Sequence, residues 1–427
     1  MSGFSLVTPL QIAGVSDRNF LVKRARPEER LFILPLSPGI QPLAPDLIPR
    51  RLDDQVLVLT MPMLAYQRDS RRFEVTATYM PEFEVFQKYS DQNAWNSLAT
   101  ASFTYFPSRR AQITLGDQYR ASQDPVRVLQ NAAILLTRGP YRNNSIRAEV
   151  AVEASPLTVF IVGYDNVITS FGQADTFQAR VLDSVAHGVS FTARRLLTRR
   201  QRLSGAYLYF TLKPIGKRGA NNNALDATHG FEHPVHSVKL AYKLLLSASS
   251  SLDISGGLAS LDTGMNYSLR VGGYRRFGEF WVGGGFSREL SFTSGVPIGE
   301  PDGLAAGGFY DIVMVRMSGQ PARRVGLRIE ATGLRDASGR RAVSSHSLVG
   351  RARADYRWTD RTVTFVSVET YQQKMNDLVP EPLSRNRFIV GIEFSFSGET
   401  QRRVNSLNQE EQYVALTDHG RRRQRPQ

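Results

Sequence analysis

A two-stranded unit of alternating apolar and polar residues recurs along the chain, and its clearest copy is residues 188–214. Residues 189–197 alternate between the two kinds of side chain, which is the period of a strand with one apolar face. The turn Thr198-Arg199-Arg200 leads into residues 202–212, where Tyr and Phe favour a second strand. A chain built from one repeated hairpin has to protect its strand edges, and a closed barrel is the simplest architecture that does so.

The connections between the repeated strands have two lengths. Short polar turns alternate with longer polar loops, which is typical of outer-membrane barrels with short periplasmic turns and long external loops. The pattern predicts an all-β, transmembrane antiparallel β-barrel of about 16–18 strands. The predicted strands cover residues 73–80, 95–105, 112–119, 146–153, 159–167, 189–197, 202–212, 238–244, 252–258, 267–271, 280–286, 325–332, 351–358 and 388–396, and the long loops are 120–143, 215–234, 293–305, 334–345 and 374–386.

The large number of repeated strands favours a barrel that is surrounded by lipid. A soluble barrel this wide would enclose a wet lumen and expose its apolar outer face to water. The slightly polar average composition fits a membrane barrel, because only every second residue of each strand faces lipid. No apolar run approaches the roughly 18 residues that a spanning helix needs. Two stacked soluble β domains that bind acidic polymers remain an alternative.

The chain divides into three parts by composition. Residues 1–54 are a Pro-rich, basic lead-in that we expect to be extended or disordered. Residues 55–398 form the barrel, and residues 399–427 form a polar, Arg-rich tail. The apolar segment Val56 to Tyr66 is broken by Pro62, so we expect an edge strand or a plug segment. Bacterial barrels of a single chain have an even number of strands. The barrel therefore has 16 strands if this segment lies outside the wall, or 18 if it lies in the wall and one further strand shows no clear pattern.

Charge and composition narrow the function classes. The formal net charge is +14, but the basic residues are spread through the chain and only Arg421-Arg422-Arg423 begins a compact cluster. This distribution argues against nucleic acid as a partner. The absence of cysteine excludes disulfides, thiolate metal sites and cysteine nucleophiles. Residues 1–49 do not show the pattern of a secretory signal, which is the main conflict with an envelope location.

Three motifs carry weak chemical signals. His229, His233 and His236 lie close together, but their loop context favours polar loop residues over a metal site. His346 follows two serines, which is little support for a nucleophile and base pair. Gly283-Gly284-Gly285 lies within a strand pattern with no helix after it, so a phosphate loop is not expected. We therefore expect no catalytic site, no metal and no cofactor.

Charged residues on the polar faces are the candidate functional residues. If the apolar faces meet lipid, these cations point into the lumen and set the field there, attracting anionic solutes. The alternative is that Arg328 with Glu330, and Arg353 with Asp355, form neutralising pairs that brace the wall. The lumen candidates are Arg147, Lys239, Arg270, Arg328, Arg351, Arg353 and Arg357, and the candidates for an interfacial aromatic girdle are Trp95, Trp281 and Trp358.

One pair of segments resembles a known family. Tyr79-Met80-Pro81-Glu82-Phe83, followed by Asp91-Gln92-Asn93-Ala94-Trp95-Asn96, resembles the opening of outer-membrane β-barrel porins of the kind often associated with exopolysaccharide export. The resemblance covers about residues 55–398. It implies a place in the Gram-negative outer membrane, among lipid and lipopolysaccharide, and polysaccharide export machinery as a partner. Such barrels usually carry a signal peptide and end on an aromatic residue, whereas here Phe396 is followed by further residues.

The sequence thus predicts a passive pore or export conduit for an exopolysaccharide or another anionic solute. A closed barrel acting as a structural or adhesive surface protein is a second interpretation. The pattern leaves the transported substrate and the oligomeric state open.

Overall fold

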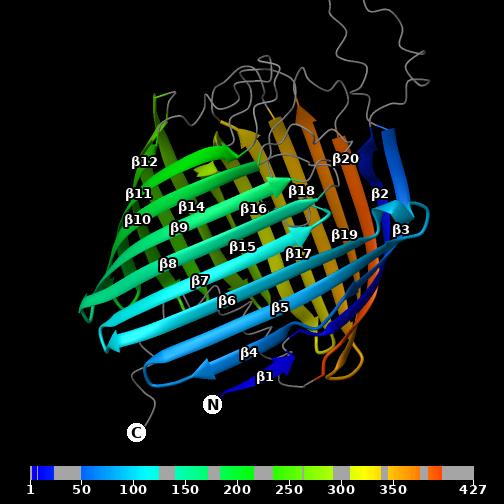
Figure 1. Ribbon diagram of the computed structural model, residues 1–427, viewed down its shortest axis with the longest axis horizontal. Coiled ribbons are helices and arrows are strands. Elements are labelled where there is room, and N and C mark those ends of the chain that lie inside the picture. The colour runs from blue at the N-terminus through cyan, green and yellow to red at the C-terminus, as the bar shows by residue number, and fades with distance from the viewer. Residues whose placement is uncertain are drawn as a thin grey trace, which may run out of the picture.

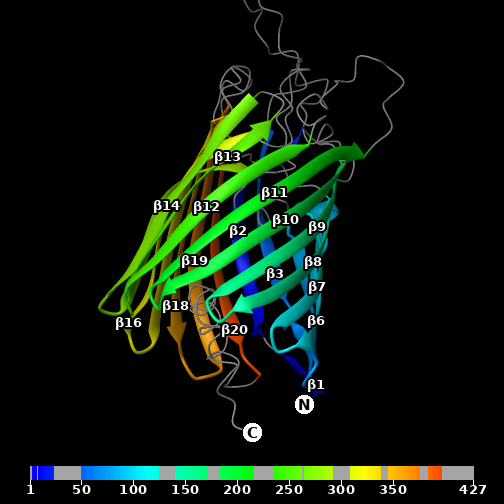
Figure 2. The same ribbon diagram turned by 90° about the vertical axis from the view of Figure 1, so that its left-hand side faces the viewer.

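The computed structural model describes ten stretches of the chain, and they form one closed antiparallel β-barrel (Figures 1 and 2). The predicted tail at 399–427, most of the long polar loops, and His229 and His233 lie outside the described residues. Within the part that is described, no helix is long and apolar enough to cross a membrane. The described residues are 2–6, 8–23, 50–124, 140–171, 183–215, 234–261, 264–291, 308–337, 345–375 and 383–396.

Each wall strand pairs antiparallel with its neighbour in sequence, so the barrel is a continuous series of hairpins. A single turn of 3₁₀ helix, η3 (Ser90–Gln92), interrupts the connection between β5 and β6. The strands are β1 (Ser2–Leu6), β2 (Leu10–Lys23), β3 (Arg50–Thr60), β4 (Leu64–Asp69), β5 (Phe73–Phe86), β6 (Ala94–Ser108), β7 (Ala111–Ser122), β8 (Tyr141–Ser155), β9 (Thr158–Phe171), β10 (Asp183–Thr198), β11 (Gln201–Ile215), β12 (Val235–Ser247), β13 (Ser250–Leu261), β14 (Gly264–Phe277), β15 (Phe280–Ser291), β16 (Gly308–Ala322), β17 (Val325–Asp336), β18 (Ser345–Arg357), β19 (Thr362–Met375) and β20 (Leu383–Phe394).

Twenty strand segments make an 18-stranded barrel, because two wall strands are each interrupted once. β1 pairs with β4 and β2 pairs with β3, while β3 and β4 both pair with β5 at successive positions. β1 with β2 therefore fills one position in the wall, and β3 with β4 fills the next. The barrel closes where β2 pairs with β20, with Leu10 opposite Phe394.

The interruption between β3 and β4 is a bulge at Pro62. Thr60 lies opposite Glu82 and Leu64 lies opposite Tyr79, so the β3–β4 side carries one extra residue. Pro62 lacks a backbone N–H and is tolerated because the ladder is already broken there. The Val56 to Tyr66 segment is thus a wall strand, and the expectation of an edge strand or plug is wrong.

Neighbouring backbone groups are satisfied across this break. The amide of Met61 donates to the Pro81 carbonyl at 3.0 Å, and the amide of Met63 donates to Thr8 Oγ1 at 2.8 Å. The bulge therefore bends the wall without leaving these two donors unpaired.

The wall begins far earlier than residue 55. Residues in the first part of the expected lead-in form β1 and β2, and β3 starts at Arg50, so the boundary at 54 is wrong. Most of the prolines that suggested an extended segment fall in residues 24–49, which are not described. The overlooked wall strand is apolar on both faces: Ile12 is exposed, while Ala13 and Val15 are buried. Such a strand shows no alternation for a period-two analysis to detect.

The outer surface of the wall is apolar and exposed. Val150, Val162, Phe191, Tyr207 and Val238 lie directly opposite one another across β8 to β12, and all are exposed. A continuous apolar row of this kind is not tolerated in water but is expected of a wall that faces hydrocarbon. The fold is therefore a transmembrane barrel, and a single closed wall replaces the alternative of two stacked soluble domains.

The two ends of the barrel differ. Turns such as Arg109-Arg110, Arg199-Arg200 and Arg323-Arg324 join strands at one end, which we call the short-turn end. The other end, the long-loop end, carries the longer connections, although β13 and β14 are separated there only by residues 262–263. The asymmetry predicted from the sequence is present, with this one exception.

Candidate functional site

All seven predicted lumen cations occupy inward positions of their strands. Lys239, for example, lies between Val238 and Leu240, which are both 59% exposed on the outer surface. Inward positions alternate along each strand with the exposed apolar residues of the outer surface, and many of them line one cavity. The residues that line this cavity come from β14 to β20 and from β2, β3 and β5. Because those strands run around the closure of the barrel, the cavity they share lies inside it.

Several inward arginines are engaged in ion pairs. Arg353 donates to Asp355 at 2.7 Å and to Glu393 at 2.6 Å, and its guanidinium lies 4.0 Å from the centre of the Phe365 ring. Arg147 donates to Glu149 at 2.9 Å, although its side chain is 60% exposed. For Arg353 the geometry favours the bracing alternative, because two carboxylates already satisfy it.

Other arginines have no carboxylate partner in the part of the chain that the structure describes. Among the described residues, Arg328 and Arg357 form no ion pair, and neither do Arg323 and Arg324 in the β16–β17 turn. All four line a cavity of about 730 Å³ at the short-turn end, which we call the vestibule. The expected pair of Arg328 with Glu330 does not form.

A row of directly opposed residues forms one side of the vestibule. Arg276, Trp281, Ser318, Arg328 and Arg353 follow one another across β14 to β18. The guanidinium of Arg276 lies 6.0 Å from the Trp281 ring centre and 3.7 Å from a carboxylate oxygen of Glu279. This side therefore presents guanidinium groups and an aromatic face to the lumen.

The three tryptophans do not share a surface. Trp95 faces outward near the long-loop end, and Trp358 faces outward beside the β18–β19 connection. Trp358 packs edge-on against Tyr356 and donates from Nε1 to Thr364 Oγ1 at 3.0 Å. Trp281 lies inward and lines the vestibule, so its assignment to an interfacial girdle is wrong. Its strand is rich in glycine and gave no clear alternation to orient it.

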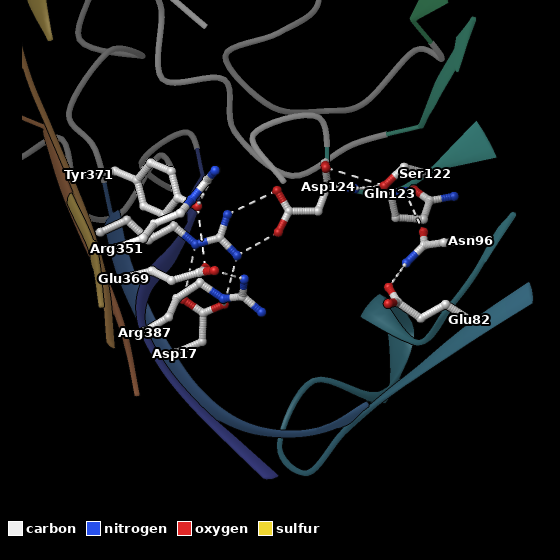
Figure 3. Close-up of polar contacts among 11 residues, drawn as sticks. Asp17, Glu82, Asn96, Ser122, Gln123, Asp124, Arg351, Glu369, Tyr371 and Arg387 are labelled. Carbon is white, nitrogen blue, oxygen red and sulfur yellow. Dashed lines mark hydrogen bonds and ion pairs between the residues drawn. The ribbon is translucent and has the colours of Figure 1, made fainter. Parts of the chain in front are cut away.

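A buried ion cluster inside the barrel was not predicted. Arg385 donates to Asp17 at 3.0 and 2.6 Å and to Asp124 at the same two distances (Figure 3). The side chains of Arg385, Asp17 and Asp124 are 3%, 3% and 0% exposed. Arg387 donates to Glu369 at 2.8 Å and lies 3.3 Å from Asp17. Charges this deeply buried are stable only when paired, and here every carboxylate has a guanidinium partner.

Asp124 reaches this cluster from a distant part of the wall. It follows the end of β7, which β2, β3, β5 and β6 separate from β20. Its amide donates to Ser122 Oγ at 3.0 Å, and the amide of Gln123 donates to Asn96 Oδ1 at 2.9 Å. In Figure 3 the Asp124 side chain points away from Ser122 and Asn96 and towards Asp17 and Arg387. The short segment Ser122–Asp124 therefore crosses part of the lumen.

An apolar cluster thickens the same side of the barrel. Val15, Val56, Val58 and Phe86 are buried together on the inner face of β2, β3 and β5. With the Arg385 cluster, they divide the lumen into a packed region and the more open vestibule. The strand predicted from the sequence begins at Phe388 and therefore omits Arg385 and Arg387. Their spacing of two residues is the one sequence signal that places both on the same face of a longer strand.

The residues of the weak motifs lie apart on different strands in the described part of the chain. Tyr207 Oη lies 2.8 Å from His236 Nδ1 on the outer face, and His346 also faces outward. No group of three potential metal ligands occurs in the part of the chain that the structure describes. A Cβ on Gly285 would lie 2.6 Å from the Val271 carbonyl oxygen, so this glycine allows two strands to approach closely.

Comparisons with known proteins identify similar folds and no family. Neither the protein-family models nor the curated protein sequences contain a match. Among solved structures, OpdQ of Pseudomonas aeruginosa is 10% identical, with 91% of this chain and 97% of that chain covered and a TM-score of 0.44. OccK3 (OpdO) of the same organism is 11% identical, with coverages of 91% and 96% and a TM-score of 0.45. The siderophore receptor PirA of P. aeruginosa is 9% identical, with coverages of 92% and 81% and a TM-score of 0.37.

Identities of this size give no residue of this chain a role. The wall itself, apolar outside and charged inside, defines the class: a transmembrane antiparallel β-barrel with a polar interior.

Proposed function

We propose that this protein is an outer-membrane channel through which anionic solutes diffuse passively. The observation that carries the proposal is a set of four arginines around the vestibule that have no carboxylate partner among the described residues: Arg323, Arg324, Arg328 and Arg357. Guanidinium groups stay charged at all physiological pH values and bind carboxylate or phosphate through two parallel hydrogen bonds.

The acidic residues of the vestibule do not cancel these charges. Asp355 and Glu393 are both bound to Arg353, and Glu279 is close to Arg276. On the opposite side, Glu82 accepts hydrogen bonds from Thr60 at 2.9 Å and from Asn96 at 3.1 Å. The unpaired positive charge therefore lies on the β17–β18 side, where a passing anion can approach it.

The chemistry of the vestibule suits more than one class of natural solute. In an outer membrane, the short-turn end would face the periplasm. A basic vestibule there suits acidic polymers as well as small anions. Export of an acidic exopolysaccharide with partner machinery is the narrower form of the proposal. It predicts that deleting the gene abolishes polymer export in the source organism, whereas a channel for small anions leaves export intact.

Ion selectivity in planar bilayers tests the channel. Under a KCl gradient, the wild-type protein should give a reversal potential that favours chloride. Replacing Arg328 and Arg357 by Gln should shift the reversal potential towards zero, because two unpaired charges are removed from the vestibule. The matched control replaces Arg109 and Arg110, which are exposed in a turn that does not line the vestibule and should leave selectivity unchanged. Equal selectivity in all three proteins would refute the role of these arginines.

A closed barrel is the second candidate. The Arg385 cluster, the crossing segment Ser122–Asp124 and the apolar cluster around Val56 all occupy the interior. If the folded protein inserts into bilayers and conducts no ions, a structural or adhesive surface protein becomes the better interpretation.

A further inference from the structure

The outer face of the barrel carries a row of charged residues, which do not face the lumen and so have no part in the proposed channel. Arg288, Asp311, Arg335, His346 and Lys374 lie directly opposite one another across β15 to β19. We propose that this outer basic row binds the phosphate groups of a glycolipid in the outer leaflet of the membrane. The inference concerns the lipid-facing surface, so it does not depend on whether the lumen conducts.

The row lies at the border of the apolar surface. One step along the same outward face, away from the long-loop end, stand Phe286, Val313 and Leu348, all exposed. Such residues belong in hydrocarbon, so the charged row next to them falls at the level where lipid headgroups begin. It also lies near the long-loop ends of its strands, which would be the external side of an outer membrane.

Within the described part of the chain, only part of the charge in the row is neutralised. Arg288 donates to Asp311 at 2.7 and 3.1 Å, and it also contacts the hydroxyl and ring face of Tyr267. Arg335, His346 and Lys374 are exposed and form no ion pair among the described residues. A cation on a lipid-facing wall is costly unless it reaches headgroups and counter-charges.

A phosphorylated glycolipid meets this arrangement better than a monoanionic phospholipid. Neighbouring strands are about 4.8 Å apart, so the three basic residues on β17, β18 and β19 span about 10 Å. A headgroup with two phosphates can contact both ends of this row at once, whereas a single phosphodiester would need both side chains to converge on one group. Partly desolvated phosphates at this border would form charge-assisted hydrogen bonds with Arg335 and Lys374.

Lipid titration of the full-length, detergent-purified protein tests the proposal. Bisphosphorylated lipid A, monophosphorylated lipid A and phosphatidylglycerol are added separately, and bound lipid is counted by native mass spectrometry. The wild-type protein should prefer the bisphosphorylated form. Replacing Arg335, His346 and Lys374 together by Gln should weaken that binding on the order of 25-fold, since Arg335 and Lys374 each contribute about a fivefold factor at an anionic lipid surface.

A matched variant controls for overall charge. Replacing Arg109 and Arg200 by Gln also removes two positive charges from exposed side chains, but at the short-turn end, and should leave lipid A binding unchanged. If the triple outer-row variant does not fold, Lys374→Gln alone should weaken binding about fivefold. Equal losses in the outer-row and control variants, or equal binding of phosphatidylglycerol and bisphosphorylated lipid A, would overturn the proposal.

Discussion

At the scale of single residues, the arginines of this barrel fall into two groups. Arg353 and Arg385 are each held by two carboxylates, whereas Arg328 and Arg357 face the vestibule without one in the described part of the chain. Sequence alternation correctly places Arg328, Arg353 and Arg357 on the inner face, but it cannot tell a bracing arginine from an available one. That distinction depends on residues far apart in the chain: Asp17 and Arg385 are separated by 368 positions.

Removing Arg385 should be severe. Arg385→Met would leave Asp17 and Asp124 buried without this partner, and breaking a buried pair in this way costs about 3–5 kcal/mol. We expect the refolded barrel to unfold at a lower urea concentration, measured by tryptophan fluorescence in detergent. Arg328→Gln is the control, because its side chain is exposed and its loss should change stability little. Equal unfolding midpoints for the two variants would mean that the buried cluster does not stabilise the wall.

At the scale of strands, the pattern succeeds where one face is apolar and fails where both are. Residues 189–197 alternate clearly and lie within β10. β2 shows no such alternation, because Ala13 and Val15 pack inside while Ile12 faces outward. The pattern misplaces Trp281 because residues 283–285 of its strand are glycines, which carry no side chain to mark a direction. Apolar packing inside the barrel and the close approach of two strands depend on tertiary contacts, so the alternation of residues along one strand does not reveal them.

The close approach of β14 and β15 gives an element-scale prediction. A Cβ on Gly285 would lie 2.6 Å from the Val271 carbonyl oxygen and 2.8 Å from the Gly272 Cα, both backbone atoms that cannot move aside easily. Gly285→Ala should therefore reduce the fraction of heat-modifiable, folded barrel on a gel. Gly205→Ala is the matched control, since a Cβ added there would have no described atom within 4 Å. A strand pair that accepts both substitutions equally would show that the spacing relaxes.

At the scale of the whole barrel, the proposed channel would owe its width and its selectivity to different parts of the lumen. The vestibule holds the arginines that lack a carboxylate partner among the described residues, whereas the crossing segment Ser122–Asp124 and the Arg385 cluster narrow the packed side (Figure 3). Asp124 is the link between the crossing segment and β20, because both its carboxylate oxygens accept hydrogen bonds from Arg385. Arg385 keeps Asp17 as a second partner if that link is lost.

Asp124→Asn should therefore widen the pore without changing its preference for anions. Loss of the charged link would let the crossing segment leave the lumen more often, so the mean single-channel conductance should rise, while the arginines of the vestibule stay in place. The double variant at Arg328 and Arg357 should do the reverse, shifting the reversal potential with little change in conductance. Single-channel recordings of both variants measure the two quantities together. If Asp124→Asn shifts selectivity as strongly as the double variant does, the constriction and the charged vestibule act as one filter rather than two.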